Sequence, residues 1–230
     1  MKYDVVIRCR NEIEWLPRVI NSLLAQSIPP EKIILVDNGS SDGSLEFAQN
    51  LQCAIVHYDK KQFNFSHALN LGFQNVSQPY TLVLSAHCEL ASQDSAEILL
   101  KTIIEFNAAA VFGRQLPTVH SNAIDTRDLL TVFGRERIIY KEHPFFHNAF
   151  SLVESDAWSK MNFDTAYNGI EDRVWARYQA QQGRLIVYEP GAMVYHEHGL
   201  NQGATIHRAK RVCNALKALH SDDCFEWPKL

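Results

Sequence analysis

The sequence predicts an α/β fold in which helices flank a mostly parallel central sheet. Short apolar runs alternate with segments of helical periodicity from the first residues onward. Strands that alternate with helices in this way predict a parallel sheet with right-handed crossovers. The predicted strands of this region are 5–7, 33–36, 53–56 and 81–84.

The helices between these strands are expected where apolar residues recur every three or four positions, at 13–24, 45–51 and about 68–76. Pro17 suits the first helix if that helix begins just before it, because the first turn needs no backbone donor. Farther along, the pattern predicts helices at about 95–107, 168–182 and 206–219, and strands at 110–112 and 185–188. The polar stretch 114–148 has few periodic signals and is expected to be a functional loop region.

The composition fits one domain and excludes several classes of protein. The chain has 230 residues, 46% of them hydrophobic, which is enough for a full core. A net charge of −4 gives no electrostatic case for nucleic acid as a partner. Five widely spaced cysteines without a CxxC pair favour a reduced, cytoplasmic setting. No apolar run is long enough for a signal peptide or a membrane span, so we expect a soluble or peripheral protein.

Polar residues follow the first two predicted strands, at the sheet edge where ligands bind in doubly wound folds. The first strand leads into RCRNE (8–12) and the second into DNGSSDGS (37–44). Carboxylates there can accept hydrogen bonds from a ribose or a base edge, and the glycines allow positive φ. Alternatively, 37–44 is only a turn and a helix cap, since the same residue types dominate turns. The missing GxGxxG motif after the first strand argues against an NAD-type site.

The strings VVIRCRNEIEWLPRVINSLLAQ and KIILVDNGSSDGS resemble the opening of family-two glycosyltransferases. The similarity continues through Asn70-Leu71-Gly72, EDRVWARYQAQQGRLIVYEP and VYHEHG, in the order and spacing of that family. FNFSHALN (63–70) and GRQLP (113–117) resemble a bacterial rhamnosyltransferase-like subset. The resemblance implies a GT-A Rossmann-like fold, a nucleoside-diphosphate-sugar donor and inversion at the anomeric carbon.

One GT-A domain is therefore expected over 1–230, with a nucleotide-sugar-binding half at about 1–95 and an acceptor and catalytic half at about 96–230. The resemblance places donor binding mainly at the ends of the first strands. The basic helix at 206–219 either neutralises phosphate or is a solvated face. The expected donor-binding residues are Arg10, Asn11, Glu12, Asp37, Ser40, Asp42, Asn70, Ser85 and Arg208.

Relatives usually place an Asp-x-Asp motif after the fourth strand, where this chain has Ser85-Ala86-His87. Losing both carboxylates weakens the oxygen site that Mg²⁺ prefers. His87 can still bind a metal, and it resembles the Asp-x-His variant of some transferases that add N-acetylgalactosamine to polypeptides. A divalent cofactor, Mn²⁺ or Mg²⁺, would then use His87. Alternatively, His87 contacts the pyrophosphate directly or only caps a loop.

VYHEHG supplies two further histidines. In a strand, His196 and His198 would share a face, which suits a metal, although such pairs are often structural.

Glu171 and Asp172 are the candidate catalytic acids. They open a predicted helix whose Ile170, Val174 and Tyr178 are expected to pack inward. Acids are also favoured there by the helix dipole, so capping is the alternative. The resemblance implies that the pair supplies the general base that deprotonates the acceptor hydroxyl, and Asp172 is preferred over Glu171.

The predicted function is inverting transfer of a sugar to a hydroxyl of a glycan, a lipid-linked or another acceptor, in surface polysaccharide or glycoconjugate synthesis. The protein is expected in the cytoplasm, either free or peripheral to the inner face of the membrane. A nucleotidyltransferase is one alternative, but it would need a glycine-rich basic loop where this chain has RCRNEIEW. A degenerate nucleotide-sugar-binding module is the other, and the retained Glu171-Asp172 pair argues against it.

Overall fold

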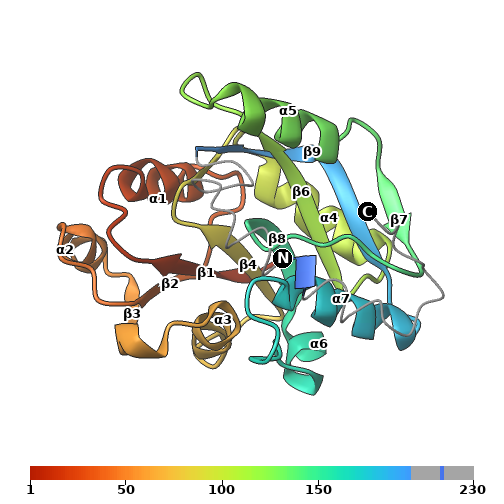
Figure 1. The fold of residues 1–230 in the computed structure, drawn as a ribbon, viewed down its shortest axis with the longest axis horizontal. Coiled ribbons are helices and arrows are strands. Elements are labelled where there is room, and N and C mark those ends of the chain that lie inside the picture. Colours follow the sequence, from red (N-terminus) through yellow and green to blue (C-terminus); the bar gives the residue numbers. More distant parts are fainter. Residues whose placement is uncertain (198–212, 215–230) are drawn as a thin grey trace.

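A computed structural model describes residues 1–197 and 213–214, and in this part of the chain nine strands form a single sheet. The sheet order is β3-β2-β1-β4-β8-β6-β9-β5, with β7 pairing to β9 (Figure 1). The strands are β1 (Tyr3–Cys9), β2 (Lys32–Asp37), β3 (Ala54–His57), β4 (Tyr80–Ser85), β5 (Cys88–Leu90), β6 (Ala110–Leu116), β7 (Ile138–Tyr140), β8 (Phe150–Glu154) and β9 (Ile186–His196).

The first four predicted strands pair in parallel, as expected: β3 with β2, β2 with β1, and β1 with β4. In the second half only β6 and β9 are parallel among the described pairs, whereas β8, β5 and β7 run antiparallel to their neighbours. The sheet is thus more mixed than predicted. The chain enters β8 from the irregular segment 141–149 rather than from a crossover helix of the kind that parallel neighbours need.

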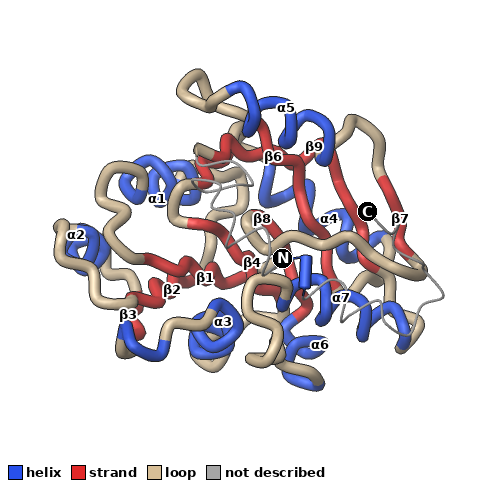
Figure 2. Tube along the Cα trace, in the orientation of Figure 1, coloured by secondary structure: helices blue, strands red, loops and turns tan. Residues whose placement is uncertain are grey.

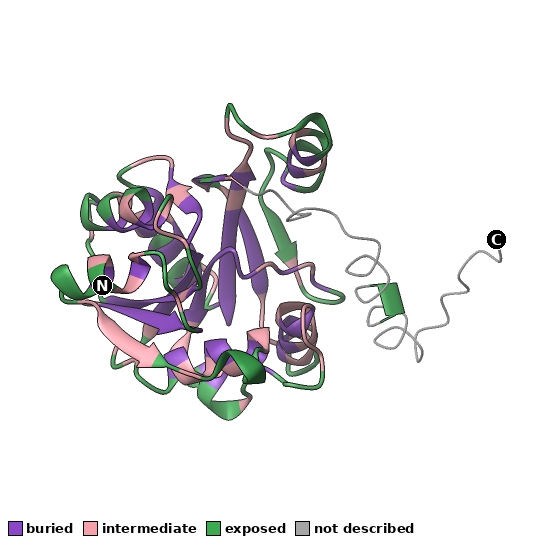
Figure 3. Ribbon diagram, turned by 60° about the vertical axis from the view of Figure 1, so that its left-hand side comes forward, coloured by how far each residue is buried: buried purple, intermediate pink, exposed green. Residues whose placement is uncertain are grey.

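Helices cover both faces of this sheet (Figures 1 and 2). One core cluster joins α1, α2 and α4 to the sheet, and the other joins α3, α6 and α7 to the opposite face. Figure 3 shows the buried strands between helices whose outer surfaces are exposed. Gly72 lets α3 approach β1 closely, because a Cβ there would overlap Val6. The helices are α1 (Leu16–Leu24), α2 (Ser44–Asn50), α3 (Phe65–Phe73), α4 (Ser95–Glu105), α5 (Ala123–Val132), α6 (Ser155–Lys160) and α7 (Glu171–Gln181), with a 3₁₀ turn at Lys60–Gln62.

None of the helices within the described residues is long and apolar enough to span a bilayer.

The interpretation of 114–148 as a loop region is wrong in part, because α5 and the short strand β7 lie within it. The carbonyl oxygen of the Asn122 side chain caps α5 by accepting hydrogen bonds from the backbone N–H groups of Ile124 and Asp125, both at 2.9 Å. The helix buries little apolar surface: Leu129 is fully buried, while its neighbour Leu130 is exposed. Such a thin apolar stripe gives a weak periodic signal.

The buried face of α7 also differs from the prediction. Ile170 is buried as expected, but it precedes the helix, and Val174 and Tyr178 are only partly buried. The face turned inward carries Glu171, Trp175, Ala176 and Gln179. The large ring of Trp175, which is fully buried among aromatic residues, determines which side of the helix packs.

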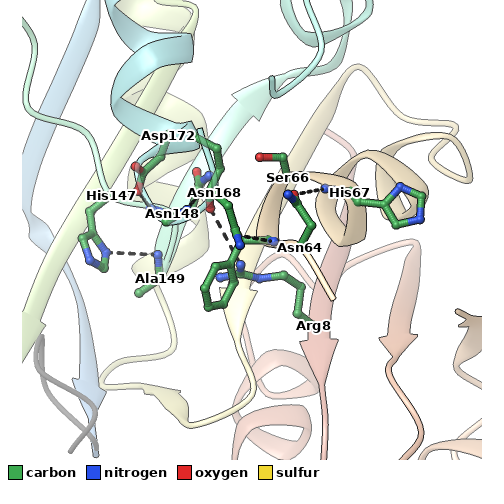
Figure 4. A network of polar contacts seen from close by, with 12 residues as sticks. Arg8, Asn64, Ser66, His67, His147, Asn148, Ala149, Asn168 and Asp172 are labelled. Atoms are coloured by element: carbon green, nitrogen blue, oxygen red, sulfur yellow. Dashed lines mark hydrogen bonds and ion pairs between the residues drawn. The ribbon is translucent and has the colours of Figure 1, made fainter. Parts of the chain in front are cut away.

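A hydrogen-bonded clamp, formed by residues 64–70 and the loop 163–168, holds the start of α7 against α3 (Figure 4). The Asn64 amide donates to the carbonyl of Thr165 at 2.9 Å, and the Ser66 hydroxyl donates to that of Asp164 at 2.8 Å. The backbone N–H of Phe65 donates to Oδ1 of Asn168 at 2.9 Å. Most of these bonds join a side chain to loop backbone, so the FNFSHALN motif fixes the position from which α7 begins.

Asn70 completes the clamp. Its Nδ2 donates to the carbonyl of Phe163 at 2.8 Å, and its Oδ1 accepts from Trp158 Nε1 at 3.1 Å and from the Phe163 N–H at 3.0 Å. Asn70 was predicted to bind the donor, but in this structure its side chain forms hydrogen bonds within the fold.

We expect Asn70→Ala to lower the free energy of unfolding by about 1–3 kcal/mol, because the half-buried partners on Trp158 and Phe163 lose their hydrogen bonds. Urea denaturation measures the effect. The matched control is Asn75→Ala, which removes one exposed hydrogen bond to Leu71 and should change stability by no more than about 0.5 kcal/mol. Equal losses in the two variants would contradict a clamp centred on Asn70.

Candidate functional site

A cavity of about 230 Å³ opens at the carboxyl ends of β1, β2 and β4, at the sheet edge that the sequence predicted for ligand binding. Four of the predicted site residues, Arg10, Glu12, Ser85 and His87, line it. The cavity also has aromatic walls and a second arginine, which the site prediction did not include. Its lining consists of Arg8, Cys9, Arg10, Glu12, Asn38, Tyr58, Phe63, Phe65, Ser85, Ala86 and His87.

Asp37, predicted to hold a ribose or base, lies at the end of β2 with its carboxylate turned into its own loop. It is 2% exposed and accepts hydrogen bonds from the N–H groups of Gly39 at 2.9 Å and Ser40 at 3.2 Å. Nδ1 of His57 lies 3.5 Å from the same carboxylate. Gly39 has a φ of +81°, which a glycine adopts at no steric cost. In this structure the carboxylate of Asp37 organises the turn beside the cavity.

Asn11, Ser40 and Asp42 tie the loops after β1 and β2 together rather than lining the cavity. The Ser40 hydroxyl accepts from the N–H of Asn11 at 3.0 Å, and Asn11 Oδ1 accepts from the N–H of Ser41 at 2.8 Å. Asp42 accepts from the N–H of Ile13 at 3.0 Å and caps the start of α2 through Ser44. For these three residues the structure matches the turn-and-cap alternative.

Asn38 is a cavity residue that the sequence reasoning missed. Its side chain is 2% exposed, and within the described residues neither its amide nitrogen nor its carbonyl oxygen has a hydrogen-bond partner. Such a buried, unsatisfied polar group is costly unless something outside the chain completes it. Its place in the string DNGSSDGS was visible, but the sequence could not show which polar side chain of that string faces the cavity.

Cys9 also lines the cavity, but burial raises the pKa of its thiol to about 11. The thiol therefore stays protonated near neutral pH and is a poor nucleophile.

The structure brings two of the predicted metal ligands together. The rings of His87 and His196 stack with centroids 5.2 Å apart and planes 20° from parallel. His87 Nδ1 lies 3.4 Å from Glu12 Oε1, and His196 Nδ1 bonds Gln115 Oε1 at 2.7 Å. Outer partners of this kind orient imidazoles for binding through Nε2.

Within residues 1–197 and 213–214, no three His, Cys, Asp or Glu side chains converge closely enough to hold a metal ion. The two imidazoles thus fit a metal as a partial ligand set, which other oxygens would have to complete. The third predicted ligand, His198, and the predicted phosphate contact Arg208 lie outside the described residues.

The two candidate catalytic acids have different environments. Glu171 is 4% exposed, accepts from the N–H of Gly169 at 2.7 Å and lies 3.8 Å from the Arg8 guanidinium. Burial, together with the neighbouring Asp172, raises the pKa of Glu171 to about 7. Asp172 is partly exposed and accepts from the N–H groups of Asn148 at 3.1 Å and Arg173 at 2.8 Å.

A polar chain connects the acids to the histidine pair. Asn148 bonds Asp172, as Figure 4 shows, and the adjacent His147 bonds the Gln115 amide through Nδ1 at 3.0 Å. The carbonyl oxygen of Gln115 in turn bonds His196. The segment PFFHN (144–148) thus lies between the two groups of candidate residues.

A second cavity, of about 450 Å³, lies on the other side of His87, against the start of α1 and the end of β9. Trp15, Arg18, Glu89, Tyr195 and Glu197 are among its walls. In the larger cavity two carboxylates outnumber the single arginine, whereas in the smaller cavity two arginines outnumber the single carboxylate of Glu12. An anionic ligand therefore fits the smaller cavity better.

Comparisons with known proteins identify a sequence family and similar folds. The sequence model described as "Glycosyl transferase family 2" matches residues 4–161. The chain is 25% identical over 210 residues to the O-antigen chain rhamnosyltransferase RfbN of Salmonella typhimurium, covering 86% of this chain and 67% of RfbN. It is 22% identical over 196 residues to the O-antigen chain rhamnosyltransferase WbaN of Salmonella anatum, covering 80% of this chain and 61% of WbaN. Both relatives are longer than this chain.

Solved structures share the fold. The mannosyltransferase PcManGT from Pyrobaculum calidifontis, solved with GDP-Man and Mn²⁺, superposes with a TM-score of 0.73 at 16% identity, covering 99% of this chain and 66% of that one. S. aureus TarS (residues 1–349) gives a TM-score of 0.69 at 12% identity, covering 97% of this chain and 73% of that one. The α/β architecture is therefore the one these proteins have.

Proposed function

Because the chain belongs to glycosyl transferase family 2, we propose that it transfers a sugar from a nucleoside-diphosphate sugar to an acceptor hydroxyl with inversion. One observation carries this proposal. A cavity with two arginines and aromatic walls lies beside a helix that begins with two carboxylates. The rhamnosyltransferase relatives favour a deoxyhexose as the sugar and a surface glycan as the product.

The cavity suits a nucleoside diphosphate in chemical terms. Tyr58, Phe63 and Phe65 offer rings on which a base can stack, and Asn38 offers one donor and one acceptor group for its polar edge. Arg10 is placed to form charge-assisted hydrogen bonds with phosphate oxygens. These roles place the nucleoside over β1 and β2 and direct the diphosphate toward Ser85 and His87.

His87 and His196 would hold a divalent cation together with phosphate oxygens of the donor. Bound there, the metal would neutralise the charge that develops on the leaving diphosphate. A pair of imidazoles suits Mn²⁺ better than Mg²⁺, which prefers oxygen ligands. Glu12 and Gln115 would orient the two rings through Nδ1.

Asp172 is the better candidate for the general base. Its carboxylate is partly exposed and is held by two backbone N–H groups, so an acceptor hydroxyl can reach it. The raised pKa of Glu171 suits a base as well, but that carboxylate is 4% exposed and faces Arg8. Access for the acceptor favours Asp172 as the base, and we propose a supporting role for Glu171.

A panel of nucleotide sugars, with and without Mn²⁺, tests the proposed function. A true donor should raise the melting temperature and release its nucleoside diphosphate in the presence of an acceptor glycan. A donor that binds without transfer or hydrolysis would instead indicate a nucleotide-sugar-binding module. That alternative is favoured by the missing carboxylates in Ser85-Ala86-His87.

We expect Asn38→Ala to weaken binding of the nucleoside diphosphate by about 1–3 kcal/mol, the scale of a lost buried hydrogen bond. Its free energy of unfolding should hardly change, because the amide has no hydrogen-bond partner within the described residues. Asp37→Ala should lower both quantities, since the turn at Gly39 and Ser40 loses its acceptor. Calorimetry with UDP and GDP, and urea denaturation, measure the two effects. Unchanged nucleotide affinity in a folded Asn38→Ala variant would remove Asn38 from the site.

Metal dependence follows from the histidine pair. We expect activity to be higher with Mn²⁺ than with Mg²⁺, or to survive chelation in part, because His87 replaces the usual carboxylates. The measurement is the initial transfer rate after treatment with EDTA and addition of each metal in turn. Strict dependence on Mg²⁺ with no activity in Mn²⁺ would contradict this expectation.

Asp172→Asn should reduce kcat at least about a hundredfold, because it removes the group that accepts the proton. An amide keeps only one of the two acceptor oxygens that the N–H groups of Asn148 and Arg173 use, so the melting temperature should fall modestly while the donor affinity should change little. Glu171→Gln should have a smaller effect on kcat. If Glu171→Gln is inactive and Asp172→Asn remains active, Glu171 is the base. If both variants stay active, neither carboxylate has this role.

A further inference from the structure

Arg8 lies between the cavity and the buried acid. It is near the end of β1, where it lines the 230 Å³ cavity, and its Nη1 is 3.8 Å from Glu171 Oε1. The side chains of the two residues are 21% and 5% exposed. The guanidinium also lies over the Phe65 ring, 4.7 Å from its centroid. Arg8 therefore contacts both the clamp and the start of α7.

The contact with Glu171 is electrostatic rather than a hydrogen bond. A separation of 3.8 Å exceeds the length of a hydrogen bond. Nη1 is buried and has no hydrogen-bond partner within the described residues. Buried donors are normally satisfied, although Nε of Arg184, which does not line this cavity, is likewise without a hydrogen-bond partner within the described residues. Arg8 thus acts on Glu171 through its charge, because no hydrogen bond joins the two groups.

The groups that face Glu171 from each side are few. Asp172, on the same helix, opposes its ionisation, as does burial. Arg8 from β1 and the N–H of Gly169 from the preceding loop favour it. Because the backbone donor is neutral, Arg8 is the cation that balances the carboxylate.

An ionised Glu171 would affect its neighbour. A negative charge next to a carboxylate makes that carboxylate hold a proton more strongly. If Asp172 is the base, as proposed above, a charged Glu171 therefore makes it a better proton acceptor. A protonated Glu171 would leave Asp172 a weaker base.

We propose that Arg8 is a positioning residue whose guanidinium holds the Glu171 carboxylate as the charged partner of Asp172. The effect of Arg8 on catalysis rests on the proposed function. The charge interaction between Arg8 and Glu171 can be tested without any substrate. Arg8 acts through Glu171, so removing Arg8 should matter only while Glu171 can titrate.

The first experiment follows Glu171 by NMR in protein labelled with ¹³C at the glutamate carboxyl groups, with Glu171→Gln used to assign the signal. Arg8→Gln should move the titration midpoint of Glu171 upward by about one pH unit, a tenfold change in the ionisation equilibrium. Arg8→Lys, which keeps the charge, should move it less. The control is Arg184→Met, which removes an arginine with 27% exposure that pairs with Glu154 at 2.7 Å, and it should leave Glu171 unchanged.

A midpoint in Arg8→Gln equal to that of the wild type would overturn the proposal. If Arg8→Gln does not fold, Arg8→Met decides, since it removes the charge but keeps an unbranched apolar side chain against the Phe65 ring. An unchanged midpoint in Arg8→Met would then overturn the proposal.

The second experiment tests the link to catalysis by a double-mutant cycle on the pH–rate profile. The acidic limb of kcat should lie near the midpoint of Glu171 in the wild type and move to higher pH in Arg8→Gln. In Glu171→Gln this limb should be lost, and adding Arg8→Gln should then shift nothing. A shift that persists in the double variant would show that Arg8 acts directly on substrate and would overturn its positioning role. If the wild type transfers no sugar, the proposed function fails, while the NMR titration still decides the Arg8–Glu171 contact.

Discussion

The candidate site depends on the clamp that joins residues 64–70 to the loop 163–168. The two segments lie about a hundred residues apart in the chain, and side-chain amides and hydroxyls of one bind backbone groups of the other. These bonds are directional, so they define a position as well as adding stability. The clamp connects the parallel half of the sheet, which forms the cavity, to the helix that carries the acids. Without it, the distance between cavity and carboxylates would not be fixed.

Polar residues at the strand ends have two distinct roles. The carboxylate of Asp37 accepts hydrogen bonds within its own loop, whereas Ser40 and Asp42 bind the loop that follows β1, and their side chains support the shape of the cavity. Asn38 and Arg8 have buried polar atoms with no hydrogen-bond partner in the described part of the chain. A protein tolerates that cost mainly where a ligand or a reaction removes it. Asn38 and Arg8 combine such an unsatisfied atom with a place in the cavity wall, which is the reason for assigning them a role toward a ligand or the reaction in the proposals above.

The sequence predicted the parallel half well because β1, β2 and β4 are short buried runs and α1, between the first two of them, has a clear apolar stripe. It also identified His87 and His196, which the fold brings into contact. It missed α5, whose apolar face is thin, and it chose the wrong face of α7 because one tryptophan outweighs the periodic pattern. It could not show that Asn38 lines the cavity while the Asp37 carboxylate binds its own loop. The side chains of adjacent turn residues point in different directions, and the backbone conformation determines which one faces the cavity. Arg8 was likewise passed over because its partner, Glu171, is distant in the sequence.

Glu171 shows how stability and function oppose each other in this site. Its pKa is raised above the unfolded value mainly by burial, so the folded state binds the proton more tightly than the unfolded state. The resulting stabilisation is complete at acidic pH, below the unfolded value, and is lost as the pH rises through about 7. The charged form that would strengthen Asp172 is therefore the form that the fold stabilises less. Arg8 and the Gly169 N–H reduce this conflict without abolishing it, because Arg8 stays beyond hydrogen-bond distance.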